Sequence, residues 1–227
     1  MAEHLHDGHR GRMRDRFMKN GLEGYQPHEV LEMLLFYAIP RRNTNPLSHR
    51  LLEQCGSLHG VISANPDMLK QVPEMTEPAV VFLTFIRALL DYDLNEQFVG
   101  KPMDTFDAVR TYFVSCFRFE RNEVVRAALL DDRLRLVQCV KVSEGHPSAA
   151  EISVRKLTEL SLHTGCNVLI LAHNHPKGTA EPSEADIAVT RSLAQALQLS
   201  GIRLVDHIVV GENNAVSLRE CGGFLGI

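Results

Sequence analysis

The sequence predicts a protein of two parts: a small all-α domain over residues 1–99, then an α/β (α+β) domain over residues 100–227 with a mixed sheet flanked by helices. Three observations predict this division. Apolar residues recur at helical spacing from about residue 27 to residue 93. Periodicity is then lost around Gly100 and Pro102, which predicts a linker near residues 94–104. Beyond the linker, strand-like runs alternate with helical segments, a pattern typical of α/β layers.

The first part is expected to be a bundle of short helices. Its helical segments read VLEMLLFYAI, PLSHRLLEQC and VVFLTFIRALL, and the breaks between them, IPRRNTNP and CGSLHG, are rich in turn-forming residues. The basic stretch from Arg10 to Lys19 is interpreted as a solvated helix start. His4, His6 and His9 are interpreted as part of a disordered, solvated beginning of the chain.

The second part supplies its elements in a clear order. EVVRAALLDDRLRLVQCVKV predicts two strands around a turn at Asp131–Asp132, and SVRKLTELSLHTG predicts a helix ended by Gly165. CNVLILA is a short, continuously apolar run, typical of a strand covered on both faces. SEADIAVTRSLAQALQLSG predicts a helix that is capped by Ser183 and closes at Gly201, and IRLVDHIVVG predicts a last strand.

Composition excludes several classes of protein. No apolar run approaches the roughly 18–20 residues that a membrane span needs, and the N-terminus lacks the apolar core of a signal peptide. The five cysteines are scattered and form no CxxC pair, which favours reduced thiols in a cytoplasmic protein. The net charge of −4 gives no general support for nucleic-acid binding.

The stretch LAHNHPKGTAEPSEAD contains the candidate metal ligands. Side chains two apart on a strand point the same way, so His173 and His175 aim at one place at the carboxyl end of their strand. Asp186 lies in the first turn of the next helix, and the loop between can fold that turn back over the histidines. Two imidazoles and one carboxylate form a three-ligand zinc set whose fourth position stays open to water, as in catalytic zinc sites.

Each residue of this set also has a simpler interpretation. A histidine pair at this spacing occurs by chance, Asp186 alone serves a helix dipole, and Ser183 alone is an ordinary N-cap. The combination, with Pro176 fixed directly after the pair and a strand, loop and helix in succession, favours a metal site.

The same residues carry a family resemblance. HNHP followed by SEAD resembles the H-x-H-x7-S-x-x-D signature of the JAMM (MPN/JAB) zinc metalloprotease superfamily. The surrounding text resembles the bacterial RadC-like (UPF0758) branch from about Asp104 to Val210, and the first part is similar to the helix-hairpin-helix region of RadC-like proteins. The resemblance implies a JAB/MPN-type catalytic domain after a helix-hairpin-helix-like domain, and a metal-dependent hydrolase that binds one Zn²⁺ per chain.

The resemblance also implies a role for each site residue. His173, His175 and Asp186 would hold the zinc. Alignment on LLDD places the acid/base glutamate, which activates the zinc-bound water, at Glu123, with Glu120 as the competing candidate. Ser183 would donate a hydrogen bond to the oxyanion, and the bond cut would be a peptide or isopeptide bond.

The chain departs from the family pattern in two places. Lys177 follows the proline where RadC-like proteins usually have serine; it either approaches an acidic group of a substrate or is solvated, and the second is favoured. The hairpin turn reads Pro73-Glu74-Met75-Thr76 in place of Pro-Gly-apolar-Gly, and Glu77 adds a second acid. Glycines at such a turn allow backbone N–H groups to approach a phosphate, so the acids make DNA binding doubtful. Residues 1–99 also hold 13 acidic and 10 basic residues.

Three functions therefore compete: a zinc metallopeptidase with an unknown peptide or protein substrate, a DNA-associated RadC-like factor, and a non-catalytic scaffold. The oligomeric state is open, and no membrane partner is expected. A zinc nucleobase deaminase is disfavoured, since its H-x-E and P-C-x-x-C pattern is missing. His146 and His163 are interpreted as loop and helix-surface residues. Asp206 and His207 either orient a zinc-bound imidazole or form a strand-end pair that serves the fold, and the second is favoured.

Overall fold

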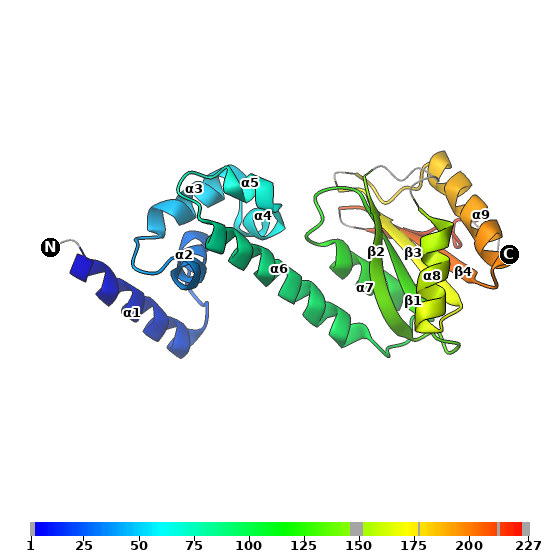
Figure 1. The fold of residues 1–227 in the computed structure, drawn as a ribbon, viewed down its shortest axis with the longest axis horizontal. Helices are drawn as coiled ribbons and strands as arrows, with labels where there is room; N and C mark the ends of the chain where they lie inside the picture. Colours follow the sequence, from blue (N-terminus) through cyan, green and yellow to red (C-terminus); the bar gives the residue numbers. More distant parts are fainter. Residues whose placement is uncertain (1–2, 146–151, 177, 213, 224–227) are drawn as a thin grey trace. The chain divides into compact units, whose positions relative to one another are not determined.

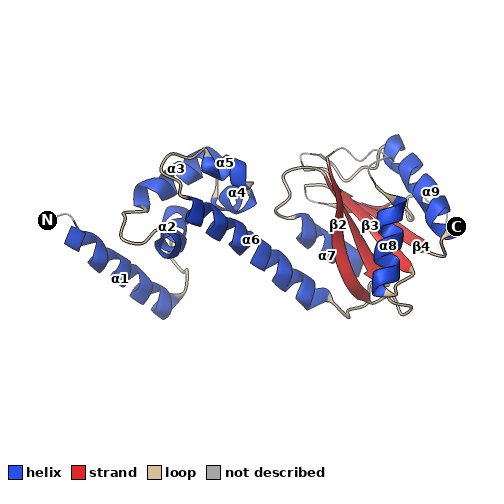
Figure 2. Ribbon diagram, in the orientation of Figure 1, coloured by secondary structure: helices blue, strands red, loops and turns tan. Residues whose placement is uncertain are grey.

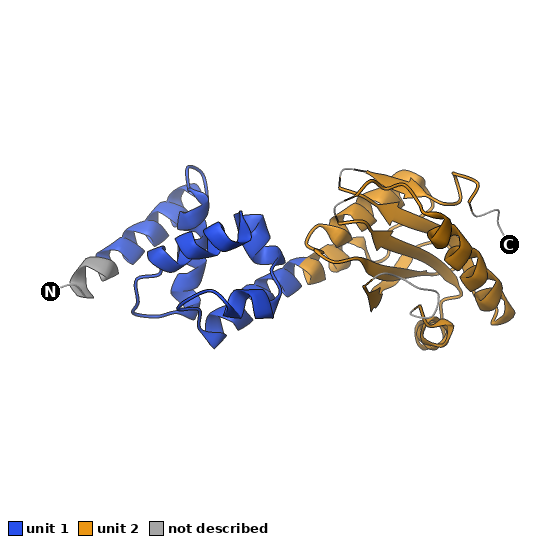
Figure 3. Ribbon diagram, turned by 90° about the horizontal axis from the view of Figure 1, so that it is seen from above, with its two compact units in different colours: residues 1–90 blue, residues 91–227 orange. Residues whose placement is uncertain are grey.

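The structure is a computed structural model and describes residues 3–145, 152–176, 178–212 and 214–223. It divides into two compact units, residues 1–90 and residues 91–227, which Figure 3 shows in different colours. The division falls within helix α6 (Glu77–Phe98), whereas the sequence places the boundary between residues 99 and 100. None of the described helices is both long enough and apolar enough to cross a membrane.

The first unit is helical, as predicted. Its helices before α6 are α1 (Glu3–Asn20), α2 (Pro27–Ala38), α3 (Asn45–Cys55), α4 (Leu58–Ser63) and α5 (Pro66–Lys70). Leu31, Leu51 and Leu83 are fully or almost fully buried in a core that α2, α3 and α6 share. Polar caps begin the short helices, for example Ser57, whose side chain accepts a hydrogen bond from the backbone of Gly60.

The expectation of a disordered start is wrong, because α1 begins at Glu3 and packs on α2; the side chains of His4 and His6 lie outside the described part of the chain. His9 Nε2 lies 3.2 Å from a carboxylate oxygen of Glu32, which is buried. Arg10 donates a hydrogen bond to the carbonyl of Ile39, and Arg16 pairs with Glu29 at 3.1 Å. Burying a carboxylate costs free energy unless it has a hydrogen-bonding partner. The contact between Glu32 and His9 supplies such a partner and so helps to hold α1 against α2. Some of the basic residues of α1 thus serve packing.

The hairpin between α5 and α6 keeps a glycine-like backbone at a residue that is not glycine. Glu74 has φ of 67°, in the left-handed region that glycine adopts most easily. Its carboxylate lies 3.0 Å from Arg42 and 3.0 Å from Arg50, so its charge is neutralised within the unit. The same pairs engage two arginines that could otherwise contact a phosphate.

In the second unit, five strands of the described residues form one mixed sheet in the order β2-β1-β3-β4-β5. Figures 1 and 2 show this sheet with helices packed around it. The strands are β1 (Val124–Leu130), β2 (Leu136–Glu144), β3 (Val168–Asn174), β4 (Arg203–Val210) and β5 (Ala215–Ser217). β3 and β4 are parallel, and the other neighbours are antiparallel. The predicted mixed sheet is confirmed. Helices α7 (Phe106–Phe117), α8 (Val154–Thr164) and α9 (Glu184–Leu199) flank it.

Three features of this unit differ from the sequence expectation. The helix α7 and the three-residue strand β5 were not predicted. The linker near residues 94–104 is too long, because α6 continues to Phe98. The end of α6 stays helical because Leu94 and Phe98, one turn apart, pack into the core of the second unit.

The two faces of the sheet follow the alternation of side chains along each strand. Leu169 and Leu171 of β3 lie in a core shared with α8 and α9. Val168, Ile170 and Ala172 lie in the core on the opposite face, which α7 covers. Every residue of β3 is buried, which confirms the prediction of a strand covered on both faces.

Candidate metal centre

The paired histidines lie where β3 ends. His173 lies two residues after Leu171 and four after Leu169 on the same strand, so its side chain is on the face of the sheet that α8 and α9 cover. The side chain is fully buried. His175 follows the strand and is partly exposed. The Nε2 atoms of the two rings are 3.1 Å apart. The structure therefore brings the two imidazoles to one point, as their spacing predicts.

The carboxylate of Asp186 lies beside both rings. Its Oδ1 is 3.4 Å from His173 Nε2, and its Oδ2 is 3.9 Å from His175 Nε2. Ser183 caps α9, and its backbone N–H and its hydroxyl both donate to Asp186 Oδ2, at 2.8 Å and 2.6 Å. The capping box that starts the helix thus fixes the carboxylate at the histidines.

The separations of 3.1 Å between the two Nε2 atoms and 3.4 Å between His173 Nε2 and Asp186 Oδ1 suit a tetrahedral metal ion. Zinc–ligand bonds of about 2.0–2.1 Å at tetrahedral angles place two ligand atoms about 3.3 Å apart. His175 Nδ1 is 2.8 Å from the carbonyl oxygen of Thr179, which only accepts, so a neutral His175 ring has its proton on Nδ1 and its lone pair on Nε2. Burial lowers the pKa of His173 to about 4, so this ring is neutral at neutral pH, as a metal ligand must be.

The loop that supplies the Thr179 carbonyl packs on the end of β4. His175 N–H donates to the carbonyl of Val210, and the backbone of Glu212 donates to Gly178. A Cβ atom at Gly211 would lie 2.4 Å from the backbone nitrogen of Ala180, which is closer than real contacts allow. Glycine at this position is therefore required by the close approach of the metal-site loop.

Glu123, and not Glu120, lies with the histidines. One carboxylate oxygen of Glu123 and one ring nitrogen each of His173 and His175 lie within 4.8 Å of one another. Glu120 instead pairs with Arg126 at 3.0 Å, and the side chain of Arg126 lies over the ring of Phe117 in α7. That pair is on the opposite face of the sheet from His173.

Asn174, between the two histidines, was not singled out in the sequence. Its side chain points to the other face, is buried, and bridges the segment that carries Glu123. Asn174 Oδ1 accepts from the backbone N–H of Val124 at 2.8 Å, and Nδ2 donates to the carbonyl of Asn122 at 3.0 Å. These bonds continue the pairing of β1 with β3 beyond its last ladder pair, Val125 with His173.

His207 also belongs to the centre, whereas Asp206 serves the fold. His207 Nε2 lies 2.8 Å from His173 Nδ1. Asp206 accepts from the hydroxyl of Ser217 in β5 and from the backbone of Arg219. Burial raises the pKa of Asp206, and these hydrogen bonds oppose that rise. The sequence favoured a purely structural pair, which is correct for Asp206 and wrong for His207.

A β-bulge decides which way His207 faces. The pairing of β4 with β3 shifts so that Leu204 opposes Leu169 while Asp206 opposes Ile170, leaving Val205 as the extra residue. Simple alternation from Leu204, which packs on the α9 face, would turn His207 to the α7 face. The bulge reverses this parity and places His207 beside His173, as bulges near functional sites often do.

His163, Lys177 and His146 were also singled out in the sequence. His163 is exposed on α8, as predicted. Lys177 and His146 lie outside the described residues.

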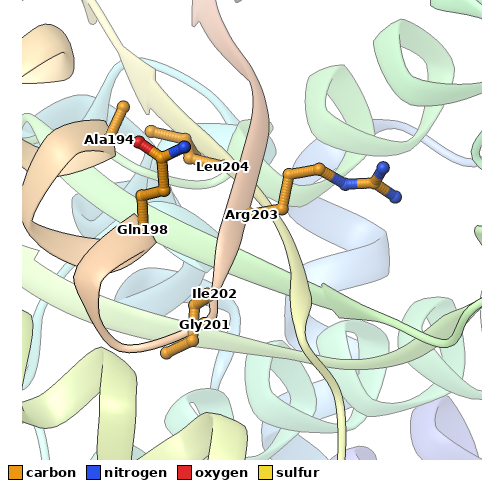
Figure 4. A pocket seen from close by; sticks show the side chains of 6 residues that line it. All are labelled: Ala194, Gln198, Gly201, Ile202, Arg203 and Leu204. Carbon is orange, nitrogen blue, oxygen red and sulfur yellow. The ribbon is translucent and has the colours of Figure 1, made fainter. Parts of the chain in front are cut away.

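A hollow of about 210 Å³ opens where α9 ends and β4 begins (Figure 4), and the residues that line it are Ala194, Gln198, Gly201, Ile202, Arg203 and Leu204. Arg203 pairs with Val168, at the opposite end of β3 from His173, so this hollow is separate from the metal centre.

Two histidines at the end of an inner strand, an aspartate in the capped first turn of the next helix, and a glutamate directly before the neighbouring strand form a candidate metal site in a domain of the JAB type. The family model described as the RadC-like JAB domain matches residues 103–223, and the chain belongs to this family.

Relatives match nearly the whole chain. A UPF0758 protein of Bordetella parapertussis is 34% identical over 92% of this chain and 93% of its own length. A UPF0758 protein of Rhodobacter capsulatus is 31% identical over 92% of this chain and 99% of its own length. A UPF0758 protein of Fusobacterium nucleatum is 28% identical over 98% of this chain and 99% of its own length.

Proposed function

We propose that this protein is a zinc-dependent metallopeptidase that hydrolyses a peptide or isopeptide bond. The observation that carries the proposal is the convergence of His173, His175 and Asp186, with Nε2 atoms 3.1 Å apart and a carboxylate oxygen 3.4 Å from the first of them. Imidazole and carboxylate form a donor set that zinc prefers, and three protein ligands leave a position for water or substrate. When bound, zinc would supply Lewis acidity, which polarises a carbonyl and acidifies water.

The two carboxylates have different surroundings, and this supports different roles. Asp186 is buried, and two hydrogen bonds from Ser183 hold its Oδ2, so it is suited to be a fixed ligand through Oδ1. Glu123 is less buried and lies within 4.8 Å of the histidine nitrogens. Glu123 would accept a proton from the attacking water and pass it to the leaving amine, which yields a free acid and an amine.

Ser183 would have two tasks. Its hydroxyl donates to Asp186 Oδ2 and also accepts from the backbone N–H of Asp186. A hydroxyl has one proton, so donating to the oxyanion of a tetrahedral intermediate would require that this proton leave Asp186 Oδ2. The backbone N–H of Ser183 would continue to hold the aspartate during that step.

The test is metal analysis followed by hydrolysis of a peptide and isopeptide library. The wild-type chain is expected to bind about one zinc, and Ala at His173, His175 or Asp186 should each lower the zinc content. Glu123→Gln should keep zinc and lose hydrolysis by about 10²- to 10⁴-fold, the usual range for a general acid/base.

Glu120→Gln serves as the matched control for the glutamate assignment, because its carboxylate pairs with Arg126. Hydrolysis should survive in this variant. Full zinc content in all three ligand variants would contradict the assignment of the metal ligands. An active Glu123→Gln variant together with an inactive Glu120→Gln variant would assign the acid/base role to Glu120. A protein that binds zinc but cleaves no library member would favour a non-catalytic scaffold.

A further inference from the structure

A buried chain of hydrogen bonds runs from the candidate ligand His173 back to the backbone of the candidate ligand Asp186. His173 Nδ1 lies 2.8 Å from His207 Nε2, and His207 Nδ1 lies 2.6 Å from Thr190 Oγ1. Thr190 Oγ1 lies 2.6 Å from the carbonyl oxygen of Asp186, one helical turn earlier. His173 and Thr190 are fully buried, and His207 is 3% exposed, so the partners within this chain decide where its protons lie.

Counting protons fixes the direction of every bond. The Asp186 carbonyl can only accept, so the single hydroxyl proton of Thr190 points to it. Thr190 Oγ1 must then accept from His207, which places a proton on His207 Nδ1. A second proton would place a positive charge on a ring that is 3% exposed and whose side-chain partners are an imidazole and a hydroxyl, so the ring carries only that proton. His207 Nε2 therefore accepts, and His173 Nδ1 donates to it.

We propose that Thr190 and His207 are positioning residues that hold His173 in the tautomer with a bare Nε2, the atom that faces His175 and Asp186. This inference rests on the metal site of the proposed function and assigns the residues that prepare it. The partly exposed His175 obtains the same tautomer from one backbone carbonyl, that of Thr179. The buried His173 has its Nδ1 against an imidazole, which can either donate or accept, so it needs Thr190 to set the direction.

The reverse direction would disable the site. If Thr190 donated to His207 Nδ1, His207 Nε2–H would donate to His173 Nδ1, and the proton of His173 would lie on Nε2. That proton would occupy the place of the metal, 3.1 Å from His175 Nε2. The hydroxyl bond to the Asp186 carbonyl would also be lost. The hydrogen bond from Thr190 to the Asp186 carbonyl thus determines whether His173 Nε2 is free to bind a metal ion or is blocked by a proton.

The tautomers can be read directly in the metal-free protein. Long-range ¹H–¹⁵N correlation spectra of the full chain with ¹⁵N-labelled histidine, after removal of metal by a chelator, distinguish Nδ1–H from Nε2–H rings. His173 and His207 are both expected to be Nδ1–H, with His207→Gln used to assign the signals. An Nε2–H ring at His173 in the wild-type protein would overturn the proposal.

Zinc affinity supplies a second readout, measured by competition with a chromophoric chelator. Thr190→Val should move the proton of His173 toward Nε2 and weaken zinc binding by about 10- to 100-fold, the usual effect of removing a partner of a metal-bound histidine. Thr190→Ser should restore both the tautomer and the affinity, because it keeps the hydroxyl.

Thr158→Val is the matched control for packing. Thr158 makes the same bond to the carbonyl four residues earlier, at 2.9 Å from Val154 O on α8. This variant should bind zinc as the wild type does. Equal affinity in Thr190→Val and Thr158→Val would refute the positioning role while leaving the proposed function standing. A wild-type protein that binds no zinc would refute the proposed function. The tautomer of His173 in the metal-free protein would still show the direction of the hydrogen bonds.

Discussion

Asn174 provides a prediction about how the acid/base segment is held. Its side chain makes two bonds to the backbone on either side of Glu123, to Val124 N–H at 2.8 Å and to Asn122 O at 3.0 Å. Asn174→Ala removes both. Val124 is fully buried, so its N–H would be left without a partner away from water. Asn122 is exposed, so water can replace the bond to its carbonyl.

The expected cost follows from this difference. An unsatisfied buried donor costs about 1–3 kcal/mol, whereas the exposed carbonyl loses little. We therefore expect Asn174→Ala to lower the free energy of unfolding by about 1–3 kcal/mol in urea titrations. If Val124 exchanges by local opening, exchange of its amide hydrogen should accelerate by roughly 5- to 150-fold, the factor that corresponds to this energy.

Asn167→Ala is the matched control, because it removes an exposed asparagine directly before the same strand. Zinc content should be unchanged in both variants, since neither side chain is a candidate ligand. The reasoning is refuted if the two variants unfold at the same urea concentration and the Val124 amide exchanges equally slowly in both.

Two further predictions concern the loop and the helical unit. Gly211→Ala should displace the backbone around Ala180 and so weaken the hydrogen bond from His175 to Thr179. We expect a zinc titration to give a lower affinity for this variant, and an unchanged affinity would contradict the prediction. The full chain should bind duplex DNA with a dissociation constant of roughly 10⁻⁴ M or weaker at physiological salt, measured by fluorescence anisotropy, because Glu74 engages two arginines of its own unit. Micromolar binding with a steep salt dependence, lost when the exposed Arg12 and Arg14 are replaced by Ala, would instead support a DNA-associated function.

Features that depend on local spacing could be predicted from the residues alone. Side chains two apart on a strand share a face, which placed His173 and His175 together. Ser183 and Asp186, three apart at a helix start, form the capping box that the structure contains. The continuously apolar run before His173 predicted a fully buried strand, and this is confirmed. In each case the decisive distance is fixed by the geometry of one helix or one strand.

Contacts between side chains from different elements could not be predicted in this way, because they depend on how the elements pack. The bulge at Val205 turns His207 toward His173, and nothing in the local alternation of β4 shows it. Thr190 joins the same network through contacts that need both α9 and β4 in place. The tail of α6 is helical because Leu94 packs in the core of the second unit, to which it belongs, although local periodicity predicts a linker there. Register and packing between segments far apart in the chain set these contacts, and residue spacing within one segment does not encode them.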